Sequence, residues 1–461
     1  MPINLLDLSK LWGRPFQTGS HELIEALGPV STDSRTLKQG DFFIPLIGEN
    51  YDGHKFLNQA HKKGAQGALV SKFNKYPVPK GLLFWYVEDT LLSYQELALI
   101  YRNLLHLPFI GVTGSSGKTT TRELIAALLR SKGPVATSQD NENNDIGVAK
   151  SILNVKDSDS AAVIEMGMRA LGEISRLSRV AKPDIAVVTN VGSAHLGCLG
   201  SLDNIAKAKC EITSHLNPNG VVVIPFGSKR LEQALAENWR GRVIRVYIES
   251  DSTYYSNSCT DVPPEFRPDI IGRFDSEDSS IHVDGIKYIL PLEGFHNAQN
   301  FLLALAVSKE LDCHFENGHR VRLELPKGRS GFLSIGNLNI MDETYNASPE
   351  AVIASLKLLM TKRGRHFAVL GEMLELGEHS LDLHIRVIKE AVDSGITGLI
   401  LVLESLDPDL IKDYVSHLPF SAIVSTPEEA IVPLVSWTQP GDFVLLKGSR
   451  AIGIERMIPL L

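Results

Sequence analysis

The sequence predicts an α/β protein of three domains. The chain has 461 residues, which is too long for one ordinary hydrophobic core. From Pro108 onward, apolar runs of strand length alternate with amphipathic helical segments, which is typical of parallel sheets covered by helices. A second alternation of the same kind begins after Pro326. We therefore expect a small N-terminal α/β domain (residues 1–106), a central domain with a parallel sheet (107–325) and a C-terminal α/β domain (326–461).

The composition is that of an ordinary soluble protein, with 43% hydrophobic and 22% charged residues. The net charge of −8 argues against a general nucleic-acid binder, which would usually present a basic face. The sequence shows neither a membrane-spanning apolar run nor a secretory signal pattern. The cysteines form no C-x-x-C pair and predict reduced thiols: Cys198, Cys210, Cys259 and Cys313. We expect a cytoplasmic protein that does not contact membrane.

The expected elements of the first domain are short strands separated by turns. The apolar run Phe42–Ile47 is followed by a glycine-rich turn, and residues 64–71 and 81–89 contain two further strand patterns. This region shows no run that points to catalysis by itself.

In the central domain, residues 108–114 read as a buried strand, and the helix that follows runs from Lys118 to Gly133. One face of this helix is apolar, with Leu124, Ile125, Leu128 and Leu129. Further apolar strands are expected at 161–167, 184–192 and 220–226. The polar stretch 249–269 predicts a loop or an excursion of β structure.

The C-terminal domain has its own set of strand patterns, separated by helical segments. They lie at residues 338–345, 365–372, 398–404 and 442–449. Lys327 and Gly328 lie just before this set, so we expect the hinge between the two larger domains near them.

The stretch TGSSGKTT, Thr113 to Thr120, indicates a phosphate-binding loop. It lies between a strand and a helix, the context in which such a loop binds a nucleotide. The strict motif G-x-x-x-x-G-K-[ST] would place a glycine where this chain has Val112, so the stretch is a variant. Gly114 and Gly117 allow the backbone to wrap so that its N–H groups point at phosphate oxygens, and the helix adds its positive end.

The residues of this loop predict separate roles in binding ATP and Mg²⁺. Lys118 is expected to face solvent until phosphate arrives and then to neutralise the β- and γ-phosphates, while Thr119 reaches Mg²⁺. The alternative is a glycine-rich turn with a surface lysine. GTP is disfavoured because the guanine signature Asn-Lys-x-Asp is absent. The expected phosphate contacts are Gly114, Ser115, Ser116, Gly117, Lys118, Thr119 and Thr120.

Two side chains that follow central strands are candidate metal ligands. Glu165 ends the strand AAVIE, and His195 follows the strand IAVVTNV. Ligands bind beyond the carboxyl ends of parallel strands, so both should lie beside the phosphate-binding loop. A carboxylate and an imidazole can complete the coordination of Mg²⁺, although oxygen is the commoner donor to this ion. The alternatives are a solvated glutamate and a structural histidine.

The segment GFHNAQN opens another helix and carries a candidate adenine contact. Asn297 and Asn300 are three residues apart and share a helix face. A carboxamide can pair with both N7 and the 6-amino group of adenine. The alternative for Asn297 is helix capping.

These motifs together resemble the Mur ligase family, the ATP-dependent amino-acid and peptide ligases of peptidoglycan synthesis. The resemblance covers nearly the whole chain. It depends on TGSSGKTT, on IEMG, on SAHL followed by IAKAKCEI, on HNAQN, and on GRS followed by MDETYNASP. DSRTLKQGDFFIPLIGENYDGHKF, NENNDIGV and LGEMLELG are similar to the branch that joins D-alanyl-D-alanine to UDP-N-acetylmuramoyl-tripeptide. The Asp-Asn-Pro motif of the branch that adds the third residue is absent.

The resemblance implies a UDP-binding N-terminal domain, a central P-loop ATPase-type domain and a Rossmann-like C-terminal domain that binds the incoming dipeptide, in a monomer. It implies that Thr119, Glu165 and His195 hold Mg²⁺, and that Asn300, with Asn297 beside it, contacts adenine. It further implies that Arg329 reaches the γ-phosphate, that Asp342 holds the ribose, and that Lys209 is carbamylated and coordinates a second Mg²⁺. The alternative for Lys209 is a surface lysine, as we expect for Lys207.

The resemblance also implies substrate contacts. The run Thr32, Asp33, Ser34 and Arg35 matches the family's UDP-sugar contact, and Gly48–His54 matches its companion loop. Residues 141–147, with Asn143 and Asn144, would contact substrate near the scissile phosphate. Each of these stretches has the alternative of an ordinary capped turn.

The implied reaction activates a carboxylate with ATP, passes through an acyl phosphate and ends in an amide. Rival products are those of the diamino-acid-adding Mur ligase and of folylpolyglutamate synthase. A rival of another class is a regulatory protein that switches on ATP without ligation.

Overall fold

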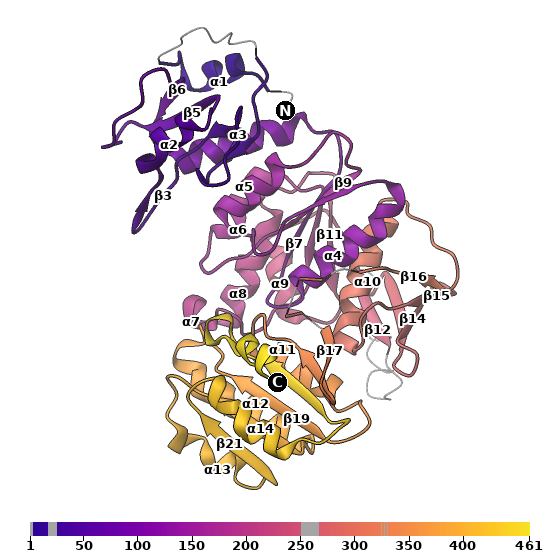
Figure 1. Cartoon of the computed structure of the whole chain (residues 1–461). Coiled ribbons are helices and arrows are strands. Elements are labelled where there is room, and N and C mark those ends of the chain that lie inside the picture. The colour runs from indigo at the N-terminus through magenta and orange to yellow at the C-terminus, as the bar shows by residue number, and fades with distance from the viewer. Residues whose placement is uncertain (1–2, 17–24, 250–266, 324, 327, 330) are drawn as a thin grey trace.

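The computed structural model describes residues 3–16, 25–249, 267–323, 325–326, 328–329 and 331–461. In this part of the chain the strands form a four-stranded, a ten-stranded, a six-stranded and a two-stranded sheet. Figure 1 shows the N-terminal and C-terminal segments at opposite ends, with the ten-stranded sheet between them. The α/β architecture follows the prediction, whereas the boundaries after residues 106 and 325 stay predictions.

The N-terminal segment contains a parallel sheet in the order β1-β2-β5-β6. Its strands are β1 (Val30–Ser31), β2 (Phe42–Phe43), β5 (Gly67–Ser71) and β6 (Phe84–Val87), and its helices are α1 (Leu5–Trp12), α2 (Leu57–Lys62) and α3 (Thr90–Leu104). The predicted strand Phe42–Ile47 is divided, because β3 (Ile47–Gly48) instead pairs antiparallel with β4 (Tyr51–Asp52). Pro45 lies at the break and has no N–H to donate to a sheet.

The core of the central sheet consists of parallel strands, and the apolar runs predict all of them except Val135–Thr137 and Arg242–Glu249. They are β7 (Phe109–Thr113), β8 (Val135–Thr137), β9 (Ala161–Glu165), β10 (Ile185–Val188), β11 (Val221–Pro225) and β12 (Arg242–Glu249). The covering helices are α4 (Lys118–Leu129), α5 (Asp145–Leu153), α6 (Glu173–Ala181), α7 (Leu196–Leu199), α8 (Leu202–Cys210), α9 (Lys229–Asn238) and α10 (Phe295–Glu310). Apolar cores lie on both faces of this sheet: Phe109 belongs to one cluster and its neighbour Ile110 to the other.

The sheet continues beyond the predicted strands. β13 (Ile270–Asp275) pairs antiparallel with β14 (Ser280–Val283), which pairs antiparallel with β15 (Ile286–Ile289), and β16 (His319–Arg320) completes the edge. These strands were missed because charged and polar residues interrupt their apolar pattern. Most of the stretch 249–269 lies outside the described residues.

The C-terminal sheet has the order β17-β18-β22-β19-β20-β21. Its strands are β17 (Gly331–Ile335), β18 (Leu338–Asp342), β19 (His366–Gly371), β20 (Gly398–Val402), β21 (Phe420–Val424) and β22 (Phe443–Lys447), and its helices are α11 (Pro349–Leu359), α12 (Ser380–Asp393), α13 (Lys412–Val415) and α14 (Ile431–Trp437). The strands from β18 onward pair in parallel, whereas β17 is an unpredicted antiparallel edge.

The register of the central strands brings the predicted site residues to one sheet edge. Val112 pairs with Glu165, and Thr113 pairs with Val188. The loop after β7, the end of β9 and the residues after β10 therefore lie side by side. Within the described residues, no helix is long and apolar enough to span a membrane.

Candidate active site

The phosphate-binding loop connects β7 to α4 through two glycines that no other residue could replace without strain. Gly114 and Gly117 have φ angles of 153° and 75°, which side chains disfavour. A Cβ at Gly114 would lie 1.8 Å from Thr189 Oγ1, and one at Gly117 would lie 2.6 Å from Asn300 Oδ1. The loop is therefore packed directly against the ends of β10 and α10.

Asn190 and Gly192, which follow β10, fix the shape of the loop. The Ser115 N–H donates to Asn190 O at 3.2 Å, and the Ser116 N–H donates to Asn190 Oδ1 at 3.0 Å. Ser115 Oγ donates to Gly192 O at 3.0 Å and accepts from Gly192 N–H at 2.8 Å. The sequence analysis missed Asn190, although a polar residue directly after a buried parallel strand is a signal that could have found it.

Lys118 is held inside the loop, which corrects the expectation that it faces solvent. It is half-buried, and its Nζ donates to Gly114 O at 2.9 Å. Burial lowers the pKa of Lys118; the Glu165 carboxylate offsets part of this effect, and the charge of Arg329 adds to it. The ammonium group is thus already placed where the loop would receive a phosphate.

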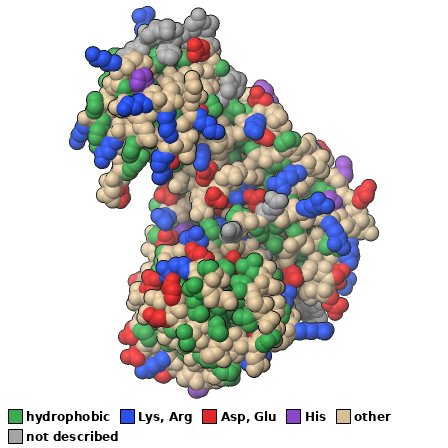
Figure 2. Space-filling view, in the orientation of Figure 1, with side chains coloured by type: hydrophobic (Ala, Val, Ile, Leu, Met, Phe, Trp, Pro, Cys, Tyr) green, Lys and Arg blue, Asp and Glu red, His purple; other side chains and the backbone are tan. Residues whose placement is uncertain are grey.

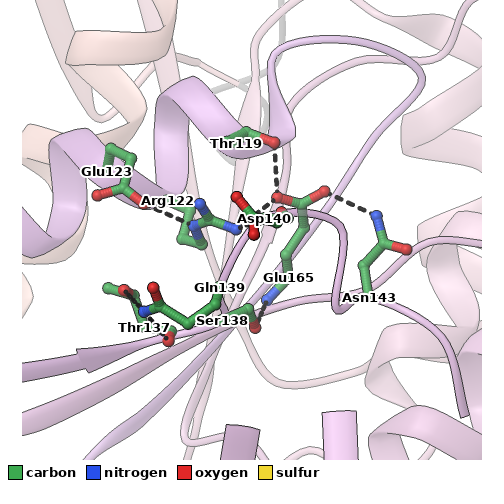
Figure 3. Close-up of polar contacts among 9 residues, drawn as sticks. All are labelled: Thr119, Arg122, Glu123, Thr137, Ser138, Gln139, Asp140, Asn143 and Glu165. Atoms are coloured by element: carbon green, nitrogen blue, oxygen red, sulfur yellow. Dashed lines mark hydrogen bonds and ion pairs between the residues drawn. The ribbon is translucent and has the colours of Figure 1, made fainter. Parts of the chain in front are cut away.

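Glu165 is buried at the end of β9, with 2% of its surface exposed, and hydrogen-bond donors surround its carboxylate (Figure 3). Oε2 accepts from Thr119 Oγ1 at 2.7 Å and from Arg122 Nη1 at 3.1 Å. Oε1 accepts from Asn143 Nδ2 at 2.9 Å. Asn143 also lies in the predicted substrate loop, so this carboxylate connects that loop to the P-loop helix α4.

His195 lies at the boundary with the C-terminal domain. Its backbone is left-handed, with a φ of 66°, and its Nδ1 contacts Glu375 Oε2. Glu375, itself at a φ of 63°, also pairs with Arg169 Nη2 at 3.2 Å. Burial and the nearby Lys118 lower the pKa of His195, although Glu375 opposes this shift.

Lys209 is 1% exposed on α8, which excludes the alternative of a surface lysine. Burial lowers the pKa of Lys209 well below its ordinary value, and the charge of Lys118 lowers it further. Lys207, two residues earlier, is exposed as expected.

Both candidate adenine contacts are buried in the first turns of α10. The helix begins after Gly294, and no side chain caps it. Asn297 Nδ2 donates to Glu293 O at 2.7 Å, so Asn297 is not the N-cap. Asn300 lies against Gly117 of the phosphate-binding loop.

A cleft of about 1050 Å³ separates the central domain from the C-terminal domain. Its lining includes the phosphate-binding loop, Glu165 and His195 from the central side, and Arg329 and Tyr345 from the C-terminal side. The Arg329 guanidinium lies 3.6 Å from the centre of the Tyr345 ring. No described residue accepts a hydrogen bond from the buried Arg329 Nε.

Asp342 lies beside this cleft at the end of β18. Its Oδ1 accepts from Thr344 Oγ1 at 2.6 Å and from Thr344 N–H at 3.2 Å. Lys327, one of the two residues expected near the hinge, lies outside the described residues. Its neighbour Gly328 lines the cleft.

Polar and backbone contacts join the two sides of the cleft. Ser193 Oγ donates to Glu350 at 2.9 Å, and the Ser193 N–H contacts the same carboxylate at 3.2 Å. Gly197 approaches Gly377 so closely that a Cβ at Gly377 would lie 2.7 Å from the Gly197 Cα. Figure 2 shows the surface hollowed between the two ends of the molecule.

Three of the four N-terminal candidates, Asp33, Ser34 and Arg35, bond to other side chains of this segment. Arg35 Nη2 donates to Asp33 Oδ2 at 2.8 Å, which lowers the pKa of Asp33. Ser34 Oγ donates to Gln59 Oε1 at 3.0 Å, and Thr32 is half-buried. In the companion loop, His54 is buried and its Nε2 accepts from Ser71 N–H at 2.9 Å, as a structural residue does. The structure does not bring this run into the lining of the cleft described above.

The two asparagines of the 141–147 stretch differ in role. Asn144 is the N-cap of α5, because its Oδ1 accepts from Gly147 N–H at 2.9 Å and from Ile146 N–H at 3.2 Å. This contact agrees with the alternative of a capped turn. Asn143 instead points its amide at Glu165, and both asparagines line the cleft.

The donor set suits Mg²⁺ better than a metal that needs a complete protein cage. Within the described part of the chain, no three His, Cys, Asp or Glu side chains form a metal-binding group. Thr119 and Glu165 offer adjacent oxygens, and His195 lines the same cleft. Mg²⁺ commonly takes one or two carboxylates, waters and substrate phosphates, so these residues fit a metal that arrives with a nucleotide.

Comparisons with known proteins agree with this geometry. The Mur ligase middle domain matches residues 112–308, and the Mur ligase, glutamate ligase domain matches residues 328–450. The UDP-N-acetylmuramoyl-tripeptide–D-alanyl-D-alanine ligase of Synechocystis is 36% identical over 94% of this chain and 91% of its own length.

Two solved structures are similar over nearly the whole chain. MurF from Acinetobacter baumannii has a TM-score of 0.84 at 26% identity and covers 99% of this chain and 98% of its own. MurF ligase from Thermotoga maritima in complex with ADP has a TM-score of 0.79 at 27% identity, with coverage of 94% and 96%.

Proposed function

The chain belongs to the Mur ligase family, and on this premise we propose that it joins D-alanyl-D-alanine to UDP-N-acetylmuramoyl-tripeptide with cleavage of ATP to ADP and phosphate. The observation that carries the proposal is the cleft itself. A phosphate-binding loop on the central side and Arg329, whose Nε has no hydrogen-bond partner among the described residues, on the C-terminal side line the same cleft. The relatives that share these domains along nearly their full length carry the name of this activity.

The nucleotide would lie across the end of the central sheet. Residues Gly114 to Thr120 would hold the phosphates, Asn300 with Asn297 the adenine, and Asp342 the ribose. The relative from Thermotoga maritima is in complex with ADP, which supports binding of an adenine nucleotide by this chain. Thr119, Glu165 and His195 would hold Mg²⁺, which neutralises phosphate charge when it is bound. A carbamylated Lys209 would coordinate a second Mg²⁺.

The first chemical step brings two anions together. The terminal carboxylate of the tripeptide attacks the γ-phosphorus in line, its new O–P bond forms as the bond to ADP breaks, and an acyl phosphate results. Like charges at ~4 Å repel by about 4 kcal/mol at an effective dielectric of ~20. Lys118 and Arg329 oppose this repulsion and stabilise the transferring phosphoryl group.

The second step forms the amide. The amine of D-alanyl-D-alanine attacks the acyl carbon, and the tetrahedral intermediate collapses with loss of inorganic phosphate. The acyl phosphate would be hydrolysed if it were exposed to bulk water. Two contacts between the domains would therefore close the cleft around it: Ser193 with Glu350, and His195 with Glu375.

The N-terminal domain would bind the UDP end of the substrate. Thr32, Asp33, Ser34 and Arg35 would contact it, and a phosphate would have to compete with Asp33 for the Arg35 guanidinium. Asn143 and Asn144 would lie near the reacting carboxylate. We propose a monomer in the cytoplasm, where its nucleotide substrates are found.

The test is phosphate release by the full chain with ATP, Mg²⁺ and UDP-N-acetylmuramoyl-tripeptide across a panel of acceptors. D-alanyl-D-alanine should give release that depends on both substrates, together with a product heavier by one dipeptide in mass spectrometry. Activity with a diamino acid on the UDP-dipeptide, or with glutamate on a folate, would assign one of the rival ligases. Release that needs no acceptor would favour an ATP-gated switch.

A further inference from the structure

Arg122 is a buried cation at the metal-binding end of the cleft that the proposed reaction does not use. It lies one helical turn after Lys118 on α4, and only 1% of its surface is exposed. Nη1 donates to Glu165 Oε2 at 3.1 Å and to Asp140 O at 3.3 Å (Figure 3). Nε and Nη2 donate to Glu123 Oε1 at 2.9 Å and 2.7 Å.

These contacts hold the guanidinium in one place. Glu123 fixes one edge and the carbonyl of Asp140 fixes part of the other, so Arg122 has no open path away from Glu165. Water cannot screen the charge of an arginine this deeply buried. The positive charge on Arg122 is therefore a permanent feature of the Glu165 site, where it offsets two carboxylates, Glu165 and Glu123.

The Glu165 carboxylate is already satisfied by the protein. Besides Arg122, Thr119 and Asn143 donate to it, so both oxygens have partners. A free divalent cation would have to displace these donors and approach a fixed positive charge. Binding at this site would add only one protein carboxylate to the coordination of the cation.

We propose that Arg122 is the built-in counter-ion of Glu165 and makes divalent-metal binding in the cleft conditional on a nucleotide. A nucleotide brings several negative charges to the adjacent phosphate-binding loop, and these outweigh the guanidinium. Arg122 is in this sense a positioning residue: it acts through Glu165 and touches no substrate. The inference depends on the proposed nucleotide–metal site and is independent of which amide the enzyme forms.

The experiment measures binding of Mn²⁺ by the full chain, with free Mn²⁺ read by electron paramagnetic resonance and the Mn²⁺ that ADP binds in solution subtracted with a sample that lacks protein. Wild-type protein should bind Mn²⁺ in the presence of ADP and bind it at least tenfold more weakly without nucleotide. Arg122→Gln keeps an N–H donor but leaves the Glu165 and Glu123 carboxylates without their shared cation, so its affinity for Mn²⁺ alone should rise by about tenfold or more. Arg122→Lys keeps the charge and should behave like wild type.

Arg102 offers a matched control. It is a buried arginine that pairs with Asp184 at 3.0 Å and donates to the carbonyls of Ala181 and Lys182. None of these partners lines the cleft described above. Arg102→Gln should lower the melting temperature and leave Mn²⁺ binding unchanged, which separates the loss of a buried guanidinium from the specific effect.

Three results would overturn the inference. Wild-type protein could bind Mn²⁺ alone as tightly as with ADP, at a site that Glu165→Gln abolishes; this result decides the question even if Arg122→Gln does not fold. A folded Arg122→Gln could show unchanged affinity, or Arg122→Lys could gain affinity as Arg122→Gln does. Absence of Mn²⁺ binding even with ADP is distinguishable, because it would refute the proposed metal site itself.

Discussion

The two sides of the cleft are built differently. On the central side, Thr119, Arg122 and Glu165 are at most 2% exposed, and Thr119 and Arg122 both donate to Glu165 within a single domain. On the C-terminal side, the Glu375 side chain is 34% exposed and its partners His195 and Arg169 belong to the other domain. Buried contacts within one domain stay formed when domains separate, whereas exposed contacts between domains do not.

This difference predicts a division of work. The central side should be rigid and ready to bind nucleotide before the second domain engages. The C-terminal side should complete the site only on closure, so its residues should affect turnover more than nucleotide binding. Substitutions on the two sides therefore test the comparison directly.

The largest effect is expected on the central side, from Lys118→Ala. Loss of the ammonium group should reduce ligation by about a thousandfold or more, because it neutralises charge on the transferring group. Stability should be retained: burial lowers the pKa of Lys118, so its charged form opposes folding and its removal costs little. Phosphate release and a melting curve measure the two effects, and near-normal activity would refute the phosphate-binding role of the loop.

A second large effect is expected from Lys209→Ala. Burial and Lys118 lower the pKa of Lys209, so at neutral pH more of its amine is uncharged than in an exposed lysine, and the uncharged amine is the form that reacts with CO₂. Activity should fall by about a hundredfold or more, and acetate should restore part of it by replacing the carbamate.

The matched control is Lys207→Ala, since Lys207 is exposed on the same helix. With ¹³C-labelled bicarbonate, wild-type protein and Lys207→Ala should share a carbamate signal in nuclear magnetic resonance that Lys209→Ala lacks. Full activity of Lys209→Ala without added carboxylate would exclude the role.

On the C-terminal side, Arg329→Ala should separate turnover from binding. The kcat should fall by about a hundredfold, because the guanidinium acts on charge that develops in transfer, while the Kd for ATP changes little. Arg329→Lys should rescue poorly, since an ammonium group lacks the planar fork. Calorimetry of ATP binding beside steady-state rates is the measurement.

Arg365 provides the control for Arg329, because it also lies over an aromatic ring, 5.2 Å from the centre of Phe367, and pairs with Asp442 at the end of the C-terminal sheet. Arg365→Ala should change stability and leave the ratio of kcat to ATP affinity unchanged. If ATP affinity in Arg329→Ala falls as far as kcat does, Arg329 is an anchor for the ground state and the division of work is wrong.

The same difference explains how far the sequence could predict the site. Strand periodicity located β7, β9 and β10, and parallel pairing then placed Glu165 and the glycine-rich loop together. Such contacts follow from local pattern and sheet geometry.

Contacts between distant segments could not be predicted in this way. Ser193 and Glu350 are 157 residues apart, and His195 and Glu375 are 180 residues apart. Their pairing depends on how two domains dock, which no local periodicity records. Arg122 was missed for a different reason: on sequence alone, an arginine in the middle of a helix is expected to be solvated, whereas in the structure its guanidinium bonds to Asp140 O and to Glu165, which lie 18 and 43 residues further along the chain.

The smallest effect is expected at the junction between Ser193 and Glu350. Glu350 is half-buried near the start of α11 and accepts from both the side chain and the N–H of Ser193. A hydrogen bond to a charged group contributes about 1–2 kcal/mol net, so Glu350→Ala should shift the domains toward the open arrangement and lower kcat about fivefold or more. Ser193→Ala should cost less, because its N–H still donates to Glu350. The double variant should be no worse than Glu350→Ala alone, since both changes remove the same interaction.

Steady-state rates measure the double-variant cycle, and small-angle scattering with and without nucleotide measures the opening of the two domains. Strictly additive losses, or an unchanged scattering profile with slower turnover, would show that this carboxylate acts within the C-terminal domain and does not hold the two sides of the cleft together.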